Sequence, residues 1–178
     1  VKDNQVKNAK RVIKKAKEKG FDAKKLEAIL SQSKGATDTK VPSQVQLISL
    51  QEYYQTGRYD DAEKLAMSLT HEFPKHEFAW KVLGAILGQT GRCAEAVNAN
   101  QAAVTLSPQD AEAHSNLGVM LQELGRLDEA KASFTQAIGL NPNFAEAHSN
   151  LAVTLQELGR LEEAESGYIQ AIALKPDY

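Results

Sequence analysis

The apolar positions of residues 111–144 recur every three or four residues in two short segments, as on the buried face of a helix. In the first segment, 112–124, the stripe consists of His114, Leu117, Gly118 and Leu121. In the second, 128–140, it consists of Ala130, Phe134, Ala137 and Ile138. Gly125 permits a left-handed turn between them, and Pro142 ends the second segment because proline cannot continue a helical hydrogen-bond ladder. The pattern therefore predicts a helical hairpin.

The same hairpin pattern follows again in residues 145–178. When 111–144 and 145–178 are aligned, 22 of the 34 positions are identical, and most differences exchange similar residues. A fixed period of this length is typical of repeat proteins, in which one hairpin cannot bury its own apolar face. Successive hairpins are therefore expected to stack and to share a continuous core.

The period extends toward the N-terminus as far as residue 43. Glycine recurs every 34 positions, each time followed by arginine, at Gly57, Gly91, Gly125 and Gly159. Alanine recurs at Ala62, Ala96, Ala130 and Ala164, and proline at Pro74, Pro108, Pro142 and Pro176. The sequence therefore predicts four two-helix repeats, 43–76, 77–110, 111–144 and 145–178.

Charge separates the part of the chain that precedes these repeats. Residues 1–40 carry 12 Lys and Arg against 5 Asp and Glu, whereas residues 41–178 carry 9 against 18. Helical apolar patterns occur over 3–19 and 23–33, so 1–42 is predicted to be a basic helical pair with its linker, either a cap or an eroded repeat. Aromatic residues do not interleave with its lysines, which favours a solvated face over a specific nucleic-acid or membrane partner.

The composition changes this picture little. The chain has 178 residues, 42% hydrophobic and 25% charged, as in one ordinary folded domain. Apolar runs fall short of the ~20 residues that span a bilayer, and the start lacks the apolar segment of a signal peptide. The single cysteine, Cys93, cannot form an internal disulfide and is expected to be inert, which fits a reducing, cytoplasmic location.

Residues 43–178 resemble the tetratricopeptide repeat (TPR) family. The third repeat carries the motif in His114, Leu117, Gly118, Leu121, Ala130, Phe134, Ala137 and Pro142, and the fourth in His148, Leu151, Ala152, Leu155, Ala164, Tyr168, Ala171 and Pro176. The second carries Trp80, Leu83, Gly84, Leu87, Ala96 and Pro108, and the first Tyr53, Gly57, Ala62 and Pro74. The resemblance implies an all-α fold, a right-handed α-solenoid of stacked helix-turn-helix repeats. Leu50 replaces a small residue and Asn100 an aromatic one, which predicts reorganised packing there.

In this family the first helices of successive repeats line a concave face that binds partner segments. The residues off the core stripe that would point there are Lys81, Glu112, Ser115, Asn116, Val119, Gln122, Glu123, Glu146, Ser149, Asn150, Val153, Gln156 and Glu157. Asn116 and Asn150 lie one repeat apart, and a side-chain amide can both donate to and accept from a peptide backbone. The surrounding segments resemble the arm of O-linked N-acetylglucosamine transferases, where an asparagine ladder binds peptide. The alternative interpretation is a solvated polar row on an unused groove.

An apolar cluster is the second candidate surface, made of Leu47, Ile48, Tyr54, Phe78 and Val82. If exposed, it would bind an amphipathic helix; the interpretation we favour is that the N-terminal helices of the same chain cover it. A charged clamp for acidic C-terminal tails, as in chaperone co-factors of this family, is not predicted. Lys81 and Asn116 fit it, but Glu146 and Asn150 occupy places that should be basic.

The sequence lacks the motifs that carry catalysis, nucleotide binding or metal binding. The sequence has no nucleotide-binding loop, metalloprotease pair or nucleophile elbow. His114 and His148 lie on the core stripe and are expected to pack rather than to bind a metal, whereas His71 and His76 are expected in a loop. We therefore expect no enzyme activity, no cofactor and no metal site.

The fourth repeat is not followed by the polar capping helix with which such arrays normally finish. Exposure is therefore expected for Tyr168, Ala171, Ile172 and Leu174, with self-association through this end. The chain is expected to be the N-terminal part of a longer protein. The main hypothesis is a non-catalytic protein–protein interaction scaffold with a protein or peptide partner. The alternatives are a self-assembling structural segment and the substrate-recruiting arm of a larger glycosyltransferase, sulfotransferase or oxygenase.

Overall fold

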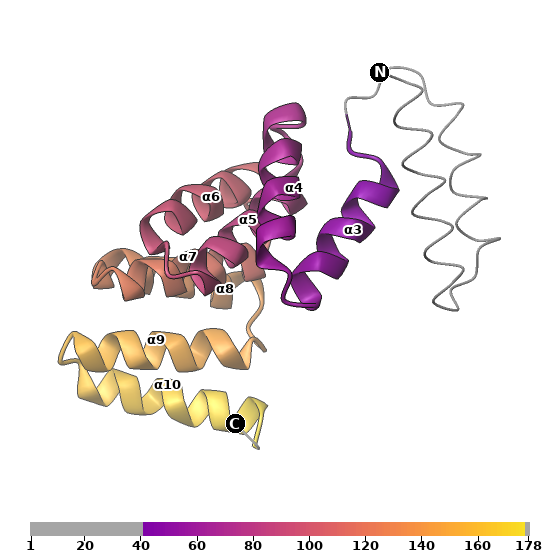
Figure 1. Ribbon diagram of the computed structural model, residues 1–178. Helices are drawn as coiled ribbons and strands as arrows, with labels where there is room; N and C mark the ends of the chain where they lie inside the picture. The colour runs from indigo at the N-terminus through magenta and orange to yellow at the C-terminus, as the bar shows by residue number, and fades with distance from the viewer. Residues whose placement is uncertain (1–40, 177–178) are drawn as a thin grey trace, which may run out of the picture. The chain divides into compact units, whose positions relative to one another are not determined.

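The structure, a computed structural model, describes residues 41–176 (Figure 1). The predicted helices 3–19 and 23–33 lie outside these residues. The chain divides into unit 1, Val1–Ser49, and unit 2, Leu50–Tyr178. In unit 1, Ser43 and Gln46 close the first turn of helix α3 (Gln44–Gln55). The backbone N–H of Ser43 donates to Gln46 Oε1 at 2.9 Å and that of Gln46 to Ser43 Oγ at 3.3 Å, which is a capping box.

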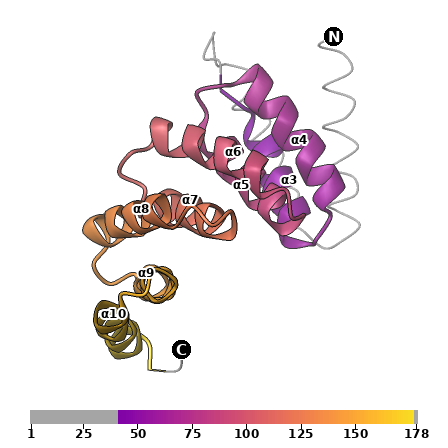
Figure 2. The same cartoon turned by 90° about the vertical axis from the view of Figure 1, so that its left-hand side faces the viewer.

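Unit 2 continues as a series of helices joined by short turns. They are α4 (Tyr59–Glu72), α5 (Glu77–Gln89), α6 (Cys93–Leu106), α7 (Ala111–Glu123), α8 (Leu127–Leu140), α9 (Ala145–Glu157) and α10 (Leu161–Leu174). Strands are absent from the described residues. Helices α5 and α6, α7 and α8, and α9 and α10 pack as pairs, and α6 contacts α7 as α8 contacts α9. The axes change direction from one pair to the next (Figure 2). The predicted all-α solenoid of helix pairs is confirmed; the repeat limits given above stay a prediction.

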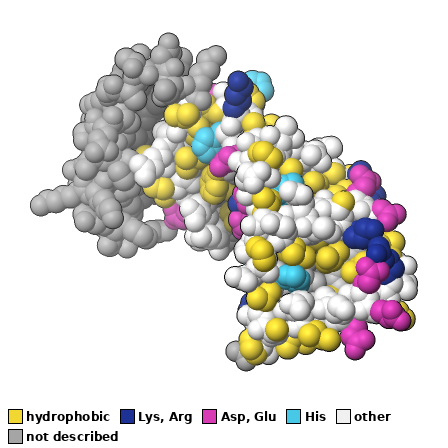
Figure 3. Space-filling view, turned by 180° about the vertical axis from the view of Figure 1, so that it is seen from behind, with side chains coloured by type: hydrophobic (Ala, Val, Ile, Leu, Met, Phe, Trp, Pro, Cys, Tyr) yellow, Lys and Arg dark blue, Asp and Glu magenta, His cyan; other side chains and the backbone are white. Residues whose placement is uncertain are grey.

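A glycine in the left-handed region turns the chain between two helices. The φ angles are 71° at Gly57, 75° at Gly91, 69° at Gly125 and 76° at Gly159, as the spacing predicted. After Gly125, the N–H of Arg126 donates to Leu121 O at 2.9 Å, which closes the end of α7. The Arg126 side chain then donates to both carboxylate oxygens of Glu129 at 2.7 and 2.6 Å, and this lowers the pKa of Glu129. Figure 3 shows acidic and basic side chains gathered along one edge of the molecule.

The core joins consecutive pairs. Its central cluster consists of Val97, Ala103 and Val104 from α6, Ala113, Leu117 and Leu121 from α7, and Ala130 and Phe134 from α8. Phe134 is fully buried and lies on the backbone of Gly118, where an added Cβ would stand 2.7 Å from the aromatic ring. The small residue and the aromatic residue of one repeat therefore form a single contact, and neighbouring helices close over it.

The second repeat lacks this aromatic side chain and packs differently. Asn100 is 1% exposed and lies against Gly84 as Phe134 lies against Gly118. Its Nδ2 donates to the backbone oxygen of Asn116 over a long 3.5 Å. Its Oδ1 is buried without a hydrogen-bond partner among the described residues. This departure from the repeat pattern therefore places an unsatisfied acceptor in the core.

Candidate functional site

The residues predicted for the concave face lie on α5, α7 and α9, and α7 contacts both of the other two helices. Four of them are exposed: Glu112, Glu123, Gln156 and Glu157. Eight are half-buried: Lys81, Asn116, Val119, Gln122, Glu146, Ser149, Asn150 and Val153. Twelve of the thirteen predicted residues are therefore at least partly exposed on these helices; that they form one binding face stays a prediction.

Ser115 corrects the prediction, because it is buried at 5% exposure and is not available to a ligand. Helix α7 contacts α5, α6, α8 and α9, so four neighbours cover more of its circumference than one apolar stripe suggests. Ser149 occupies the matching position on α9, which contacts α7, α8 and α10, and it is half-buried.

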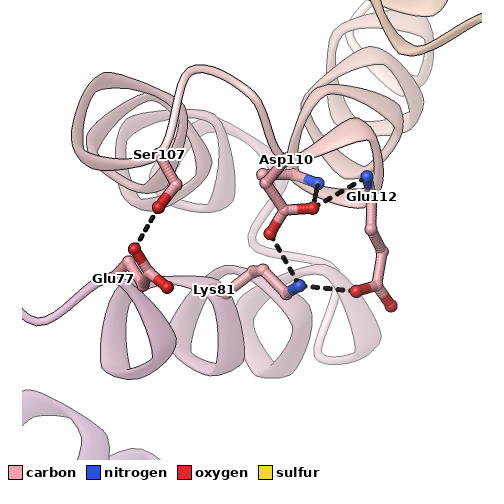
Figure 4. Close-up of polar contacts among 6 residues, drawn as sticks. Glu77, Lys81, Ser107, Asp110 and Glu112 are labelled. Carbon is pink, nitrogen blue, oxygen red and sulfur yellow. Dashed lines mark hydrogen bonds and ion pairs between the residues drawn. The ribbon is translucent and has the colours of Figure 1, made fainter. Parts of the chain in front are cut away.

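Lys81 lies in an ionic network between α5 and the start of α7 (Figure 4). Its Nζ donates to Asp110 Oδ2 at 2.9 Å and to Glu112 Oε2 at 2.5 Å. Asp110 also caps α7, because its Oδ1 accepts the backbone N–H groups of Glu112 at 2.9 Å and Ala113 at 3.1 Å. Beside this network, Ser107 Oγ donates to Glu77 Oε2. Lys81 therefore joins two helices and is already paired with two carboxylates.

The hydrogen bonds and charges of this network raise the pKa of Lys81 and lower the pKa of Asp110. Burial alone would lower the pKa of Lys81, but hydrogen bonds to Glu112 and Asp110 outweigh it and raise the pKa above 10.5. Burial alone would raise the pKa of Asp110, but the hydrogen bonds from Lys81 and the α7 backbone lower it below 3.8. Both groups are therefore held in their charged forms across the neutral range.

Other polar residues of the predicted set also have partners. Gln122 Nε2 donates to Glu157 Oε1 at 3.2 Å and so links α7 with α9. The hydroxyl of Tyr168 donates to Gln156 Oε1 at 3.0 Å, and Lys175 Nζ donates to Glu146 Oε1 at 3.2 Å. These side chains hold neighbouring helices together, which limits what they can offer to a ligand.

Asn116 and Asn150 differ from these residues. They occupy the same position on α7 and α9, one 34-residue period apart, and both are half-buried. Within the described residues, neither side-chain amide has a hydrogen-bond partner. Each therefore presents one donor group and one acceptor oxygen on the surface of the first helices.

A cavity of about 420 Å³ opens next to Asn116 in unit 2. Its lining includes Tyr54, Gly84, Cys93, Asn100, Asn116 and Glu123. The helical pattern did not reveal this cavity, because its lining comes from α5, α6 and α7 together with Tyr54. Its lining runs from Tyr54 to Glu123, so no pattern within one 34-residue period signals it.

The predicted apolar cluster needs a second correction. Val82 is buried at 8% exposure, because α5 contacts α4, α6 and α7, and it is a core residue. Tyr54 and Phe78 are half-buried, whereas Leu47 and Ile48 belong to unit 1. Val82 therefore cannot form part of a binding patch.

His114 and His148 have a role that periodicity missed. Both are half-buried, and their Nε2 atoms lie 3.0 Å from the backbone oxygens of Pro108 and Pro142. Trp80 Nε1 donates to Pro74 O at 2.9 Å in the same way. Because a carbonyl oxygen only accepts, each histidine carries a proton on Nε2 and fixes the preceding loop. In residues 41–176 we find no group of three His, Cys, Asp or Glu side chains that could hold a metal ion.

The folded part of the chain described here also lacks a helix of the length and apolarity needed to cross a membrane. Stacked helix pairs, glycine turns and a polar face on the first helices define a helical-repeat interaction scaffold. Family models agree: one described as tetratricopeptide repeat matches residues 121–178, and one described as TPR repeat matches residues 84–125. The chain belongs to the tetratricopeptide repeat family.

Solved structures resemble the chain over most of its length. MamA AMB-1 is 30% identical, with a TM-score of 0.68 over 75% of this chain and 79% of that chain. The first TPR of Spaghetti (RPAP3), bound to the HSP90 peptide SRMEEVD, is 25% identical, with a TM-score of 0.65 over 68% of this chain and 99% of that one. MamA from Desulfovibrio magneticus RS-1 is 17% identical, with a TM-score of 0.73 over 96% and 94%, and shows the fold alone. A search of curated proteins found no match.

Proposed function

We propose that this scaffold binds an extended peptide or partner segment across α7 and α9 and that Asn116 and Asn150 hold its backbone. The observation that carries this proposal is a pair of amides, at equivalent positions of successive repeats, that have no partner within residues 41–176. Neighbouring polar residues are already bonded within the protein, as Gln122 is to Glu157. The two amides are therefore the groups best suited to take a peptide.

The spacing of a repeat suits an extended chain. Packed helices lie about 8–10 Å apart, and an extended peptide rises about 3.3 Å per residue. One asparagine per repeat would therefore meet about every third peptide residue. Because the amides pair with backbone groups, the intervening side chains would be free to vary.

An acidic ligand is not favoured. The RPAP3 repeat structure contains the acidic peptide SRMEEVD. In this chain Lys81, the basic residue predicted for the same face, already pairs with Asp110 and Glu112. We therefore propose a neutral or basic peptide as the partner.

A peptide array tests the proposal. The full chain is incubated with arrayed peptides, and the Asn116→Ala/Asn150→Ala variant is compared with it. We expect the variant to lose about tenfold or more in affinity across peptides of different sequence, since two hydrogen bonds of about 0.5–1.5 kcal/mol each are removed. Asn98→Ala/Asn143→Ala, at two exposed asparagines, is the matched control. Unchanged binding by the first variant would mean that the asparagines do not hold the peptide.

Self-association through α10 is a second candidate function. The exposed fractions are 65% for Leu161, 57% for Ile169 and 55% for Ile172. Ile138, one repeat earlier, is half-buried on a helix that packs against α9. Figure 3 shows hydrophobic side chains at the lower end of the molecule, where α9 and α10 lie. The exposure predicted for Ile172 is confirmed, whereas that of Ala171 is wrong, because α9 covers this small residue to 2% exposure.

Light scattering tests this second function. We expect the unmodified chain to form dimers at micromolar concentration and Ile169→Glu/Ile172→Glu to be monomeric, because each buried isoleucine contributes about 1.5–3 kcal/mol to such a contact. Thr135→Glu/Gln136→Glu on α8 is the matched control and leaves the apolar face intact. A monomeric unmodified chain would rule out this function. A role as the arm of a larger enzyme and a cytoplasmic location stay predictions.

A further inference from the structure

We propose that the peptide bound across α7 and α9 carries two basic residues, lysine or arginine, three positions apart, which pair with Glu123 and Glu157. This inference rests on the proposed peptide binding and names the side chains that the peptide needs. Glu123 is the last residue of α7 and Glu157 the last residue of α9, and both are exposed. The two carboxylates therefore lie one 34-residue period apart, as Asn116 and Asn150 do.

Each of these carboxylates lies on the same helix as one of the two amides. Glu123 follows Asn116 by seven residues, and Glu157 follows Asn150 by seven. Seven residues are close to two turns of an α-helix, about 10.5 Å along its axis, so amide and carboxylate share one helix face. Asn116 and Glu123 both line the cavity of unit 2, which agrees with a shared face on α7.

The carboxylates at the starts of α7 and α9 already have basic partners. Glu112 Oε2 lies 2.5 Å from Lys81 Nζ, and Glu146 Oε1 lies 3.2 Å from Lys175 Nζ. A basic side chain of a ligand would compete with these lysines. The starts of the two helices are therefore poor sites for it.

The carboxylates at the ends of α7 and α9 have no basic partner within residues 41–176. Glu157 Oε1 accepts the neutral amide of Gln122 at 3.2 Å, and Glu123 forms no ion pair among the described residues. Neither helix has a basic residue in its last turn. Because a helix C-terminus carries partial negative charge, a carboxylate there is unfavourable unless a cation comes close. A lysine or arginine of the peptide would supply that cation at both helices.

The separation of the two helices sets the spacing of the basic residues. Helices α7 and α9 are in contact, and packed helices lie about 8–10 Å apart. A peptide in the polyproline II conformation has three residues per turn and rises about 3.1 Å per residue, so residues i and i+3 lie about 9 Å apart on the same side. Basic residues at these two positions would meet one carboxylate per repeat, and their long stems would extend from the backbone toward the helix ends.

Three peptides with blocked ends test the charge and the spacing: AARAARAA, its analogue with citrulline in place of both arginines, and ARAAAARA. Calorimetry with the full chain measures their binding at low salt. We expect AARAARAA to bind about fivefold more tightly than the citrulline analogue, and this preference to disappear at about 1 M salt. ARAAAARA should bind more weakly than AARAARAA, because it can reach one carboxylate at a time. Equal affinity for all three peptides would overturn the inference.

Two variants with the same loss of charge test which carboxylates are responsible. Glu123→Gln/Glu157→Gln keeps the size of both side chains and should reduce the preference for arginine over citrulline below about twofold. Asp128→Asn/Glu162→Gln is the matched control and should keep the preference, because these exposed carboxylates, also one period apart, lie in the first turns of α8 and α10. An unchanged preference in the first variant would show that the peptide binds elsewhere.

Urea unfolding gives a second measurement on the first variant. Glu123→Gln/Glu157→Gln should be at least as stable as the unmodified chain, because a carboxylate at a helix C-terminus is unfavourable. A clear loss of stability would assign these carboxylates a structural role and would overturn the inference.

The same peptides separate this inference from the proposed function. If AARAARAA keeps its affinity for Asn116→Ala/Asn150→Ala but loses it for Glu123→Gln/Glu157→Gln, the carboxylates bind the basic residues and the proposed role of the amides fails. If the asparagine variant loses all peptide binding and the unmodified chain does not distinguish arginine from citrulline, the proposed function stands and this inference fails.

Discussion

At Gly118, the space that a side chain would need is taken by the ring of Phe134, 2.7 Å from the position of an added Cβ. We expect Gly118→Ala to lower the free energy of unfolding by about 1–3 kcal/mol, because the fully buried ring cannot move away without strain. Urea unfolding followed by circular dichroism measures this change.

Gly139 provides the control for that substitution. It lies inside α8, is exposed, and has no atom within 4 Å of an added Cβ. Gly139→Ala should therefore stabilise the protein by about 0.5–1 kcal/mol, since alanine loses less backbone entropy in a helix. If the two substitutions had the same effect, close packing at Gly118 would not be the cause.

Asn100 leads to the opposite expectation for stability. Asn100→Phe removes a buried acceptor for which the described part of the chain offers no partner, and it adds apolar contact with Gly84, as in the following repeat. We expect the free energy of unfolding to rise by about 1–3 kcal/mol, measured by the same urea titration. A loss of stability would mean that the amide makes interactions that outweigh the cavity beside it.

Some single residues could be predicted from the sequence and others could not. The left-handed conformation of the turn glycines could be predicted from their 34-residue spacing, because a tight turn between the two helices of each repeat needs that conformation. The burial of Ser115 and Val82 could not be predicted from the sequence pattern, since it depends on how many helices surround α7 and α5. The hydrogen bonds of His114 and His148 to proline carbonyls also depend on loop geometry that periodicity does not contain.

At the scale of elements, the start of α7 differs from that of α9. Asp110 caps α7 and receives Lys81, whereas Phe144, one period later, makes no side-chain cap. We expect Asp110→Ala to lower the free energy of unfolding by about 1–2 kcal/mol, because the helix loses its cap and the ion pair loses a partner. Asp128→Ala, at an 86% exposed carboxylate in the first turn of α8, should cost about 0.5 kcal/mol or less and serves as control.

The contribution of Asp110 should depend on pH in a defined direction. Its pKa in the folded protein is lowered below 3.8, so the stability it contributes is present above 3.8 and is lost as the pH falls through the folded value. The stability gap between the unmodified chain and Asp110→Ala should therefore shrink below pH 3.8. A gap that stayed constant down to acid pH would show that the charge of Asp110 does not matter.

At the scale of the whole molecule, a period of 34 residues was enough to predict stacked helix pairs, because neither helix of a hairpin can bury its apolar face alone. The role of Asn116 and Asn150 in binding a peptide stays a prediction, since the period fixes only that they occupy equivalent, half-buried positions on α7 and α9. The cavity could not be predicted from the period, because its lining runs from Tyr54 to Glu123 and so extends over more than one period. Asn100, which stands where the next repeat has Phe134, is therefore a residue that distinguishes this scaffold from a regular array.

The central claim is that Asn116 and Asn150 bind the backbone of an extended peptide. Calorimetry tests it most directly, with the full chain, a peptide selected on the array, and the same peptide methylated at alternate backbone nitrogens. We predict that methylation weakens binding to the unmodified chain by about tenfold and leaves the already weak binding to Asn116→Ala/Asn150→Ala unchanged. Equal affinity of the unmodified chain for the two peptides, or full affinity of the double variant for the unmethylated one, would contradict the claim.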